Sequence, residues 1–504
     1  MPQRAPWAIC TKAQASVARA RRSAAGLLFV ILFLRRLYKW RFRTPRGLPR
    51  AVGHWLFGVL PEVMHAVNTK SLQDWFVRQH ALHGKTLSVH LPFQPIIVNT
   101  IDPKNVEHAL KTKFDNYIKG EWFRRRLTDL LGDGIFNIDG AAWHKQRKIT
   151  SQMFTQNQFK NHIWRVIGRN CGKVVKVLLA VPQGEVVDVF NVMNRFTLDT
   201  IGSVGFARDI GALDNAQTPF LRSFDRAQQI TALRFITPLW ELMRWFGIGE
   251  EREARQHLKL LQDYSMETVQ LLKADTEADK GDSFVGLFVK AAQKNGIDYD
   301  DNYLKDLVLN FLIAGRDTTA QSLSWIFWLV MCHPDVEARI VQEVEDTLGD
   351  EPVTYENSSK LTYVQNVIHE GLRLYPSVPL DSKIAIGDDT LPDGTFIPSG
   401  TVVQYSAYAM ARSTDLWGDD AEAFKPERWE GRAPPSAFEY PVFNAGPREC
   451  LGKRLAMVEM KALLLLIVKE VQLSLAVPAE EVRPDFQLTI GMSTGLPCHA
   501  RPRA

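Results

Sequence analysis

The sequence predicts a mainly helical protein, in which one large domain with a small β-rich region follows a short membrane-anchor segment. Of the 504 residues, 45% are hydrophobic and 23% are charged, a globular composition that excludes disordered, collagen-like and fibrous proteins. Helical patterns cover most of the chain, and strand and turn signals are confined to short stretches. No internal repeat or linker follows residue 50, which favours one large domain over several small ones.

Positive charge is concentrated at the N-terminus. Residues 1–50 contain twelve Lys and Arg and no Asp or Glu, so the rest of the chain carries −7 within a net charge of +5. The body is therefore mildly acidic, and the charge gives no indication of nucleic-acid binding. The five cysteines are widely scattered without a CxxC pair, which argues against a zinc ribbon or a disulfide scaffold and favours a reducing compartment.

An apolar run at residues 24–34 lies inside the basic segment, with Arg21 and Arg22 preceding it and Arg35 and Arg36 following it. A full membrane span needs about 20 residues, and this run is shorter. It therefore either inserts into one side of the bilayer or spans it with the flanking arginine side chains reaching to the lipid headgroups. No small-residue cleavage site follows, and the basic residues after the run favour the cytosolic side. We predict an anchor over residues 1–44 and one domain over 45–504. An organelle transit peptide and a buried core helix are the alternatives.

The body is expected to be mostly helical from residue 61 to 296, with a hairpin over 85–100, where apolar and polar residues alternate around a proline-containing turn. The apolar pattern over 301–331 predicts one long helix, closed by Cys332-His333-Pro334. The remaining expected elements are helices over 362–375 and 455–470 and strands over 382–405 and 486–501.

The most specific feature is the segment FNAGPRECLG, residues 443–452, directly before the last expected helix. Gly446 and Gly452 permit tight turns and the close approach of a flat ligand to the backbone. Backbone N–H groups at the start of the helix and the positive charge of Arg448 stabilise a thiolate at Cys450. A thiolate in this setting suits haem iron. A buried loop cysteine is the alternative, but chance agreement at five fixed positions is very small.

This segment resembles the haem-binding signature of the cytochrome P450 superfamily of haem-thiolate monooxygenases, and the similarity extends over about residues 45–502. The resemblance implies the cytochrome P450 fold and haem b as a non-covalently bound cofactor. It implies Cys450 as the axial ligand of the iron, Phe443 as a shield of the thiolate, and Arg448 as a contact to a haem propionate.

Two further motifs resemble those of the family at independent places. Glu370 and Arg373 form a Glu-x-x-Arg pair on one helix face. The resemblance implies that Arg428 joins them in a structural charge triad.

Three more residues are implied to reach the propionates. Trp143 and Arg147 lie four residues apart and therefore on one helix face. Lys383 stands where most relatives carry an arginine. A lysine ammonium is a point charge and cannot bind a carboxylate through two parallel N–H groups as arginine does, so its propionate contact is expected to differ from that of the relatives.

The segment AGRDTT, residues 314–319, lies midway along the long helix, where glycine and threonine are poor helix formers. A tolerated kink is one interpretation, since threonine can bond to the carbonyl one turn earlier. The family resemblance implies instead that Thr318 and Asp317 are catalytic and supply protons for oxygen activation. Ala314 stands where animal ω-hydroxylases often carry a glutamate linked to the haem, so covalent attachment is not expected.

A narrower resemblance is to the fatty-acid hydroxylase clan of plants, fungi and related eukaryotes, and it implies oxidation at or near the ω carbon. It rests on AGRDTTA, PSVPLDSK, DDTLPDGT, SAYAMAR and GDGIFNIDGAAWHKQRK. Residues expected to line the substrate channel are Phe311, Leu312, Ile313, Val378, Pro379, Met492 and Thr494. No arginine is singled out as a carboxylate anchor. A terpenoid, sterol or xenobiotic substrate is the alternative, as are a haem-binding protein that is not a monooxygenase and a peroxygenase.

Only 54 residues follow Cys450, so electrons are expected from a separate NADPH-dependent flavoprotein reductase. Four basic residues, Lys145, Lys148, Lys453 and Arg454, are expected on the cysteine side and suit an acidic partner, although they also fit an ordinary solvated surface. The other expected partners are a small lipophilic substrate and membrane lipid, with no nucleic acid. The anchor predicts the endoplasmic reticulum membrane with the haem domain on the cytosolic side, and a mitochondrial location is the alternative.

Overall fold

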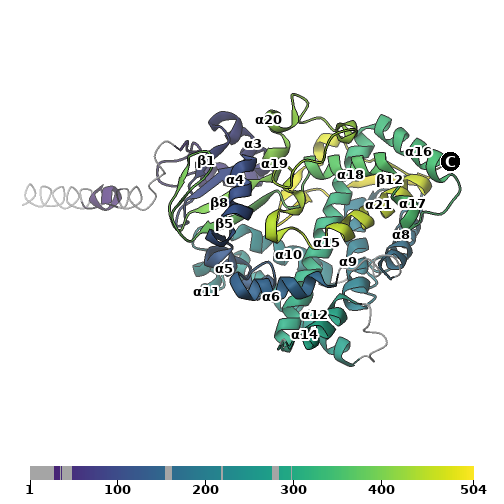
Figure 1. Cartoon of the computed structure of the whole chain (residues 1–504), viewed down its shortest axis with the longest axis horizontal. Coiled ribbons are helices and arrows are strands. Elements are labelled where there is room, and N and C mark those ends of the chain that lie inside the picture. Colours follow the sequence, from purple (N-terminus) through teal and green to yellow (C-terminus); the bar gives the residue numbers. More distant parts are fainter. Residues whose placement is uncertain are drawn as a thin grey trace, which may run out of the picture.

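The computed structural model of the protein describes residues 26, 28–33, 36, 48–153, 162–216, 219–274, 283–296 and 298–503. The body is mainly helical, with the largest sheet at one side and most of the helices at the other (Figure 1). The main helices are α2 (Leu60–Asn68), α3 (Leu72–His83), α4 (Pro103–Glu107), α5 (Gly120–Leu131), α6 (Gly140–Ser151), α8 (Trp164–Leu179), α9 (Val189–Phe206), α10 (Pro219–Leu233), α11 (Trp240–Phe246), α12 (Glu250–Ala274), α14 (Phe284–Lys294), α15 (Asp301–Cys332), α16 (Pro334–Leu348), α17 (Tyr355–Ser358), α18 (Thr362–Leu374), α19 (Ala407–Ala411), α20 (Thr414–Trp417) and α21 (Lys453–Glu470).

The largest sheet has five strands in the order β1-β2-β8-β5-β3. Strands β1 and β2 form an antiparallel hairpin, whereas β2 pairs with β8 in parallel, with Ile97 opposite Val402. A second sheet has the order β4-β12-β9, and two further pairs are β10-β11 and β6-β7. The strands are β1 (Thr86–Val89), β2 (Ile97–Thr100), β3 (Tyr117–Ile118), β4 (Val187–Asp188), β5 (Leu380–Ala385), β6 (Asp389–Thr390), β7 (Phe396–Ile397), β8 (Val402–Ser406), β9 (Val471–Leu475), β10 (Pro484–Phe486), β11 (Ile490–Met492) and β12 (Pro497–Pro502).

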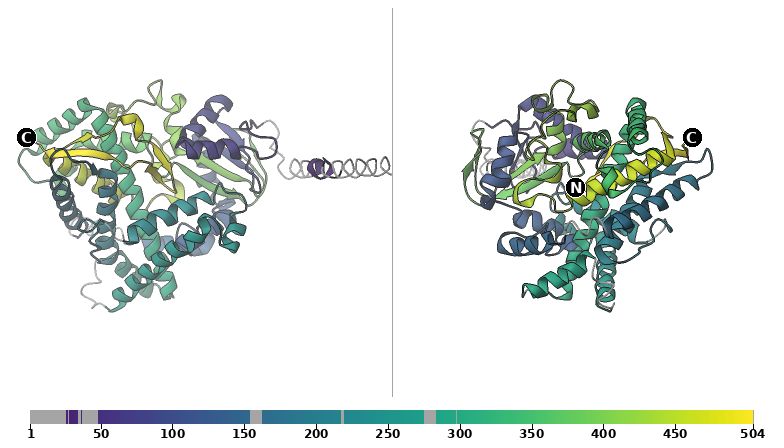
Figure 2. Two further views of the ribbon diagram at one scale, coloured as in Figure 1. Left: turned by 180° about the vertical axis from the view of Figure 1, so that it is seen from behind. Right: turned by 45° about the vertical axis from the view of Figure 1, so that its right-hand side comes forward.

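Helix α15 runs through the middle of the molecule and organises the core (Figure 1). Its start is fixed by the Asp300 carboxylate, which accepts a hydrogen bond from the Tyr303 N–H (2.8 Å), and it ends where Pro334 begins α16. At Gly315 a Cβ atom would lie 2.6 Å from the side chain of Ile201, so only glycine lets α15 and α9 approach this closely. Helix α21, which also contacts α15, crosses near it in Figure 2.

The structure confirms the main elements expected from the sequence. The helices expected over 301–331, 362–375 and 455–470 correspond to α15, α18 and α21, with ends within about two residues. The hairpin expected over 85–100 is the β1–β2 pair. The strand-rich regions expected near residues 382–405 and 486–501 are also present.

Most of the predicted anchor, residues 1–44, lies outside the described residues. Within it, residues 28–33 are helical, and each of them is 37–69% exposed. They lie apart from the body, on the side of the five-stranded sheet (Figures 1 and 2). This exposure excludes the buried core helix as an interpretation of these residues. Among the described helices, none combines the length and the apolar character needed to cross a bilayer.

Candidate active site

The cysteine loop connects two short 3₁₀ turns, η5 (Pro441–Phe443) and η6 (Gly446–Arg448), to the start of α21. It is closed by a backbone hydrogen bond from the Cys450 N–H to the Phe443 carbonyl oxygen (2.8 Å). Gly446 has φ +64°, and a Cβ atom there would overlap the carbonyl oxygen of Leu110 in η1 (His108–Thr112). Glycine is therefore required both by the left-handed backbone and by the contact with η1.

Cys450 is exposed as a residue, although protein surrounds its sulfur. Burial raises the pKa of this thiol, while the N–H groups of Gly452 and Lys453 and the positive charge of Arg147 act in the opposite direction. Arg147 also donates a hydrogen bond to the Glu449 carbonyl oxygen and so lies against the loop. The loop thus aims N–H dipoles and a guanidinium at the sulfur, which favours a ligating thiolate.

Arg448 turns away from the cysteine towards the start of α6. It donates hydrogen bonds to the Asp139 carboxylate (2.7 Å) and to the Ile138 carbonyl oxygen (2.9 Å). Its guanidinium stacks over the buried ring of Trp143, 4.5 Å from the ring centroid. The structure therefore brings Arg448 to Trp143 and Arg147, which lie about 300 residues earlier in the sequence.

Lys383 on β5 is buried beside a second lysine, Lys119, and both bind the same carboxylate, Asp381. Lys383 lies 2.7 Å from Asp381, and burial lowers the pKa of Lys383 to about 7. Burial acts to raise the pKa of Asp381, but the two lysines together hold it well below its usual range. Asn444 of the cysteine loop donates a hydrogen bond to Asp381 (3.1 Å), which links this cluster to the loop.

The acid and the alcohol of AGRDTT occupy different environments on α15. The Thr318 hydroxyl donates a hydrogen bond to the Ala314 carbonyl oxygen (2.6 Å), as expected for threonine inside a helix. Asp317 is buried, and its Oδ1 accepts a hydrogen bond from Arg316 (2.7 Å). Its Oδ2 accepts none in the described structure, although the Gln228 carboxamide lies near it without reaching hydrogen-bond geometry. Burial raises the pKa of Asp317 to about 6, while Arg316 opposes the rise.

Arg316 itself connects Asp317 to the surface. Its Nη1 also donates to the exposed carboxylate of Asp225 on α10 (2.5 Å). An exposed acid, a buried guanidinium and a buried acid thus form one hydrogen-bonded series that ends at α15.

The segments expected to line the substrate channel converge on α15. The Ser377 hydroxyl donates to the Thr318 carbonyl oxygen (2.7 Å), and the Ile490 N–H donates to the Ser377 carbonyl oxygen (2.9 Å). Among the expected lining residues, Leu312, Ile313 and Met492 are buried, whereas Val378 is 40% exposed. The segments that precede β5 and form β11 therefore lie beside the acid–alcohol pair.

The expected charge triad joins Glu370 and Arg373 of α18 to Arg428 of the turn Pro426–Trp429. Arg373 makes two parallel hydrogen bonds of 2.8 Å to Glu370, and both side chains are fully buried. Arg428 reaches the same carboxylate at 3.2 Å, and the Trp429 indole N–H donates to it at 3.0 Å. The remaining N–H groups of the Arg373 guanidinium donate hydrogen bonds to the backbone carbonyl oxygens of Ala411, Ala421 and Ala423. All hydrogen-bonding groups of this buried charge are thus engaged.

Sequence reasoning missed several members of the site. Asp381 and Lys383 lie two apart on β5 and therefore on one face, but the expected strand region began at residue 382 and left Asp381 outside it. Arg316 stands within AGRDTT itself. No local signal marks Lys119 or Asp225, because each meets its partner across a long sequence separation.

The known proteins that this chain resembles belong to one family. The family model of cytochrome P450 matches residues 48–496. The chain is 36% identical to cytochrome P450 94C1 of Arabidopsis thaliana over 88% of this chain and 93% of that protein. It is 34% identical to cytochrome P450 86B1 of Arabidopsis thaliana (93% and 88%) and 33% identical to cytochrome P450 CYP94D108 of Paris polyphylla (92% and 94%).

The fold and these matches define a haem-thiolate monooxygenase. The chain belongs to the cytochrome P450 family, whose members bind haem b non-covalently with a cysteine thiolate as iron ligand. Such enzymes are oxidoreductases, and they typically receive electrons from a redox partner and act on lipophilic substrates.

The residues around the cysteine loop fit haem. Cys450 supplies a sulfur towards which N–H groups and Arg147 point. Four cations, Lys119, Arg147, Lys383 and Arg448, are wholly or partly buried here, and the buried carboxylate Asp381 and the partly buried Asp139 balance only some of their charge. Haem carries two propionate carboxylates, which suit the excess positive charge.

Proposed function

We propose that residues 45–504 form a cytochrome P450 haem domain in which Cys450 is the axial ligand of the iron. The observation that carries this assignment is the cysteine loop, which Gly446 holds against η1 and in which N–H groups and Arg147 face the sulfur. Arg448, Trp143, Arg147 and Lys383 hold the propionate side, while Phe443 and Gly452 flank the sulfur. The charge triad holds α18 to the turn at Pro426–Trp429 through the ion pairs of Glu370 with Arg373 and Arg428.

Bound haem supplies oxygen activation, in which one atom of dioxygen enters a C–H bond and the other leaves as water with two electrons and two protons. Asp317 and Thr318 are proposed to deliver those protons. Asp317 Oδ2 is free to hold a proton, and its pKa of about 6 lies near the working pH. Thr318 Oγ1 donates to Ala314, so its lone pairs remain able to accept a proton and its orientation is fixed.

The proposed substrate is a fatty acid, hydroxylated at or near the ω carbon. Support comes from the five segments that resemble the fatty-acid hydroxylase clan and from the buried apolar side chains of Leu312, Ile313 and Met492 beside the acid–alcohol pair. A flexible alkyl chain suits such a lining because burial of its methylene groups is favourable, by about 0.8 kcal/mol each.

Electrons are proposed to come from an NADPH-dependent flavoprotein reductase that docks on the cysteine side. The expected basic residues Lys145, Lys148, Lys453 and Arg454 are exposed there, and Lys145 and Lys148 line a surface hollow of about 430 Å³. Exposed charge of one sign steers an acidic partner. Residues 1–44 are proposed to anchor the enzyme in the endoplasmic reticulum membrane, with the haem domain on the cytosolic side.

Reconstitution with such a reductase and NADPH tests the proposal. Dodecanoate, hexadecanoate, a sterol and a terpenoid are supplied in parallel, and products are identified by mass spectrometry. Hydroxylated fatty acid is expected, whereas product from the sterol or terpenoid alone would replace the substrate assignment.

Cys450→Ala is expected to abolish the red-shifted Soret band of the reduced carbon monoxide complex, which requires a thiolate ligand. Cys332→Ala, at another partly buried cysteine, is the matched control and keeps the band.

A further inference from the structure

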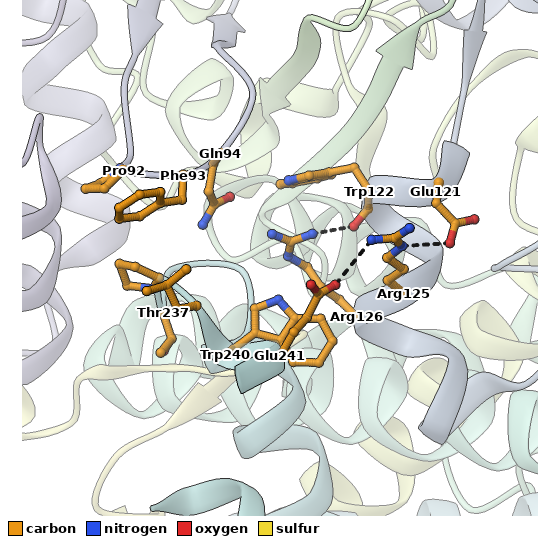
Figure 3. Close-up of a pocket in the computed structure, with 12 residues that line it drawn as sticks. Pro92, Phe93, Gln94, Glu121, Trp122, Arg125, Arg126, Thr237, Trp240 and Glu241 are labelled. Atoms are coloured by element: carbon orange, nitrogen blue, oxygen red, sulfur yellow. Dashed lines mark hydrogen bonds and ion pairs between the residues drawn. The ribbon is translucent and has the colours of Figure 1, made fainter. Parts of the chain in front are cut away.

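A small pocket of about 250 Å³ lies outside the cysteine loop, between α5, the loop after β1 and the start of α11 (Figure 3). The residues that line it include Phe93, Gln94, Trp122, Arg126, Leu239 and Trp240. The volume is below the roughly 300–1,000 Å³ of pockets that enclose whole drug-sized ligands. It therefore suits one end of a longer molecule.

Among the described residues, Arg126 is a buried cation that makes no ion pair with a carboxylate, although the charge of Glu241 attracts it without direct contact. Its side chain is 7% exposed, and Figure 3 shows its guanidinium between Gln94 and Trp122. Nε donates to the Arg234 carbonyl oxygen (3.1 Å) and Nη1 to the Trp122 carbonyl oxygen (2.5 Å). Nη2 donates no hydrogen bond within the described residues. Burial lowers the pKa of Arg126 to about 10, so the group stays charged at neutral pH.

The neighbouring arginines are paired, which sets Arg126 apart. Arg125 binds Glu121 (2.9 Å) and Glu241 (3.6 Å), and Arg234 binds Glu251 (2.7 Å). The acids at this pocket are thus engaged by other cations. A buried charge with no carboxylate in direct contact is costly, so this position favours binding of an anion.

A second donor faces the same pocket. The indole Nε1 of Trp122 is buried and has no hydrogen-bond partner in the described structure, and the Arg126 guanidinium stacks over this ring at 4.5 Å. An N–H of a guanidinium and an N–H of an indole together match the two acceptor oxygens of a carboxylate.

The rim of the pocket is apolar. Phe93 is 75% exposed and Leu239 is 49% exposed. Both have left-handed backbone (φ +59° and +56°), a conformation that is strained for large side chains and that is found at ligand-binding loops. A cation at the base and exposed apolar side chains at the rim make an amphipathic pocket.

The position along α5 suits the remote end of a substrate. Lys119, directly before α5, contacts Asp381 beside the cysteine loop. Arg126 lies seven residues further on, roughly 10 Å at the rise of a helix. We propose that this pocket binds the carboxylate of the acyl substrate, with Arg126 Nη2 and Trp122 Nε1 as its donors. The inference rests on the proposed fatty-acid substrate and deepens it, because a carboxylate held here keeps the opposite end of the chain free to reach the haem.

Matched ligands test the proposal on the holoenzyme. Isothermal titration calorimetry compares dodecanoate with methyl dodecanoate and dodecan-1-ol, which share the alkyl chain and lack the negative charge. Arg126→Gln is expected to weaken dodecanoate binding about tenfold or more and to leave the ester and alcohol nearly unchanged. Arg124→Gln, an exposed arginine of the same helix that is paired with Asp133 and lies outside the pocket, is the control and changes neither.

Two milder variants keep the test decisive if Arg126→Gln does not fold. Trp122→Phe keeps the ring and removes the Nε1 donor, and it is expected to weaken dodecanoate alone by several-fold. Glu241→Gln, at an exposed side chain near Arg126, removes a repelling charge and is expected to strengthen dodecanoate binding several-fold.

The outcomes separate this inference from the proposed function. If wild-type enzyme hydroxylates dodecanoate but the folded variants leave the preference for acid over ester unchanged, the anchor is wrong and the proposed function stands. An equal loss for acid and ester also overturns the anchor, because it indicates a general change in packing. If wild-type enzyme neither binds nor oxidises any fatty acid, the proposed function fails and the anchor fails with it.

Discussion

Asp317 combines two properties that rarely occur in one carboxyl group. It is buried, which raises its pKa to about 6, yet Arg316 connects it to the exposed carboxylate of Asp225. A carboxyl group in a fully isolated pocket exchanges protons slowly with solvent, whereas this one has a polar path to the surface. Asp317 and Thr318, whose hydroxyl orientation is fixed, are consecutive residues of α15. This arrangement suits repeated delivery of protons at neutral pH.

Thr318→Ala tests the role of the hydroxyl. Haem content and substrate affinity are expected to stay near wild type, because the hydrogen bonds of Thr318 in the described structure join it to Ala314, Ser322 and Ser377, and none of them reaches the cysteine loop. Loss of a positioned proton donor costs about 10²–10⁴-fold in the step that it serves. NADPH should still be consumed, while hydroxylated product falls and hydrogen peroxide rises.

Thr318→Ser is the matched control, since serine keeps a hydroxyl able to donate to the Ala314 carbonyl. It should restore most of the yield of product per NADPH. Wild-type yield in Thr318→Ala would return AGRDTT to the alternative interpretation, a tolerated kink.

The raised pKa of Asp317 also predicts a pH-dependent stability. Its pKa is about 6 in the folded chain and near 3.8 in the unfolded chain, so the folded state binds more protons between these values. Stability from this group is therefore greatest at low pH and is lost as the pH rises through 6. Between pH 5 and 8 the loss is about 1 kcal/mol.

Thermal melting of wild type and Asp317→Asn across this pH range measures the effect. The difference between the two curves should change with pH, because asparagine does not titrate and the lost contact to Arg316 is the same at every pH. Parallel curves would show that Asp317 has no raised pKa.

At the scale of elements, the contact between η6 and η1 holds the cysteine loop in place. Gly446→Ala is expected to displace the loop, because the added Cβ overlaps the Leu110 carbonyl oxygen and the backbone is left-handed. Lower retention of haem at normal expression is the expected result, measured as haem per protein after purification. A variant with full haem content would show that this contact does not position the loop.

Gly394→Ala separates steric overlap from backbone strain. Gly394 also has positive φ (+87°), but a Cβ atom there has nothing within 4 Å. This variant carries only the conformational cost, about 1–2 kcal/mol, and is expected to keep its haem. Equal loss of haem in both variants would assign the effect to strain alone.

The limits of α15, α18 and α21 could be predicted because their signals are local. Asp300 caps α15, Pro334 ends it, and the apolar pattern between them continues without interruption. The cysteine motif and the charge pair on α18 are also short-range patterns, so their residues were identified before the structure placed them together.

Contacts between distant segments could not be predicted in the same way. The parallel pairing of β2 with β8 and the sharing of Asp381 by Lys119 and Lys383 depend on packing over hundreds of residues. Gly315 appeared only as a poor helix former, whereas its function in packing is to admit Ile201 of α9. Arg126 emerged as a candidate only when the structure showed that this buried arginine lines a pocket without an ion pair to an acid among the described residues.

At the scale of the whole molecule, charge and apolar surface divide the chain into two parts. The first 50 residues hold twelve basic side chains, and the body carries a net charge of −7. The described apolar residues Leu28–Phe33 are exposed and lie apart from the body (Figure 2). Because these apolar side chains are exposed and do not pack in the core of the body, their insertion into lipid breaks no packing contact of the fold. Membrane attachment and haem binding are therefore expected to be separable.

Deletion of residues 1–43 tests this separation. The truncated protein is expected to shift from the membrane pellet to the supernatant, with an unchanged spectrum of the reduced carbon monoxide complex. A second variant keeps all basic residues and carries Leu28→Ser, Val30→Ser and Leu32→Ser, which removes apolar insertion but not attraction to anionic lipid. Washing with about 1 M salt, which shortens electrostatic range to roughly 3 Å, should then release this variant and not the wild type. Truncated protein without haem would make the segment part of the core, and truncated protein that stays fully membrane-bound would assign attachment to the body.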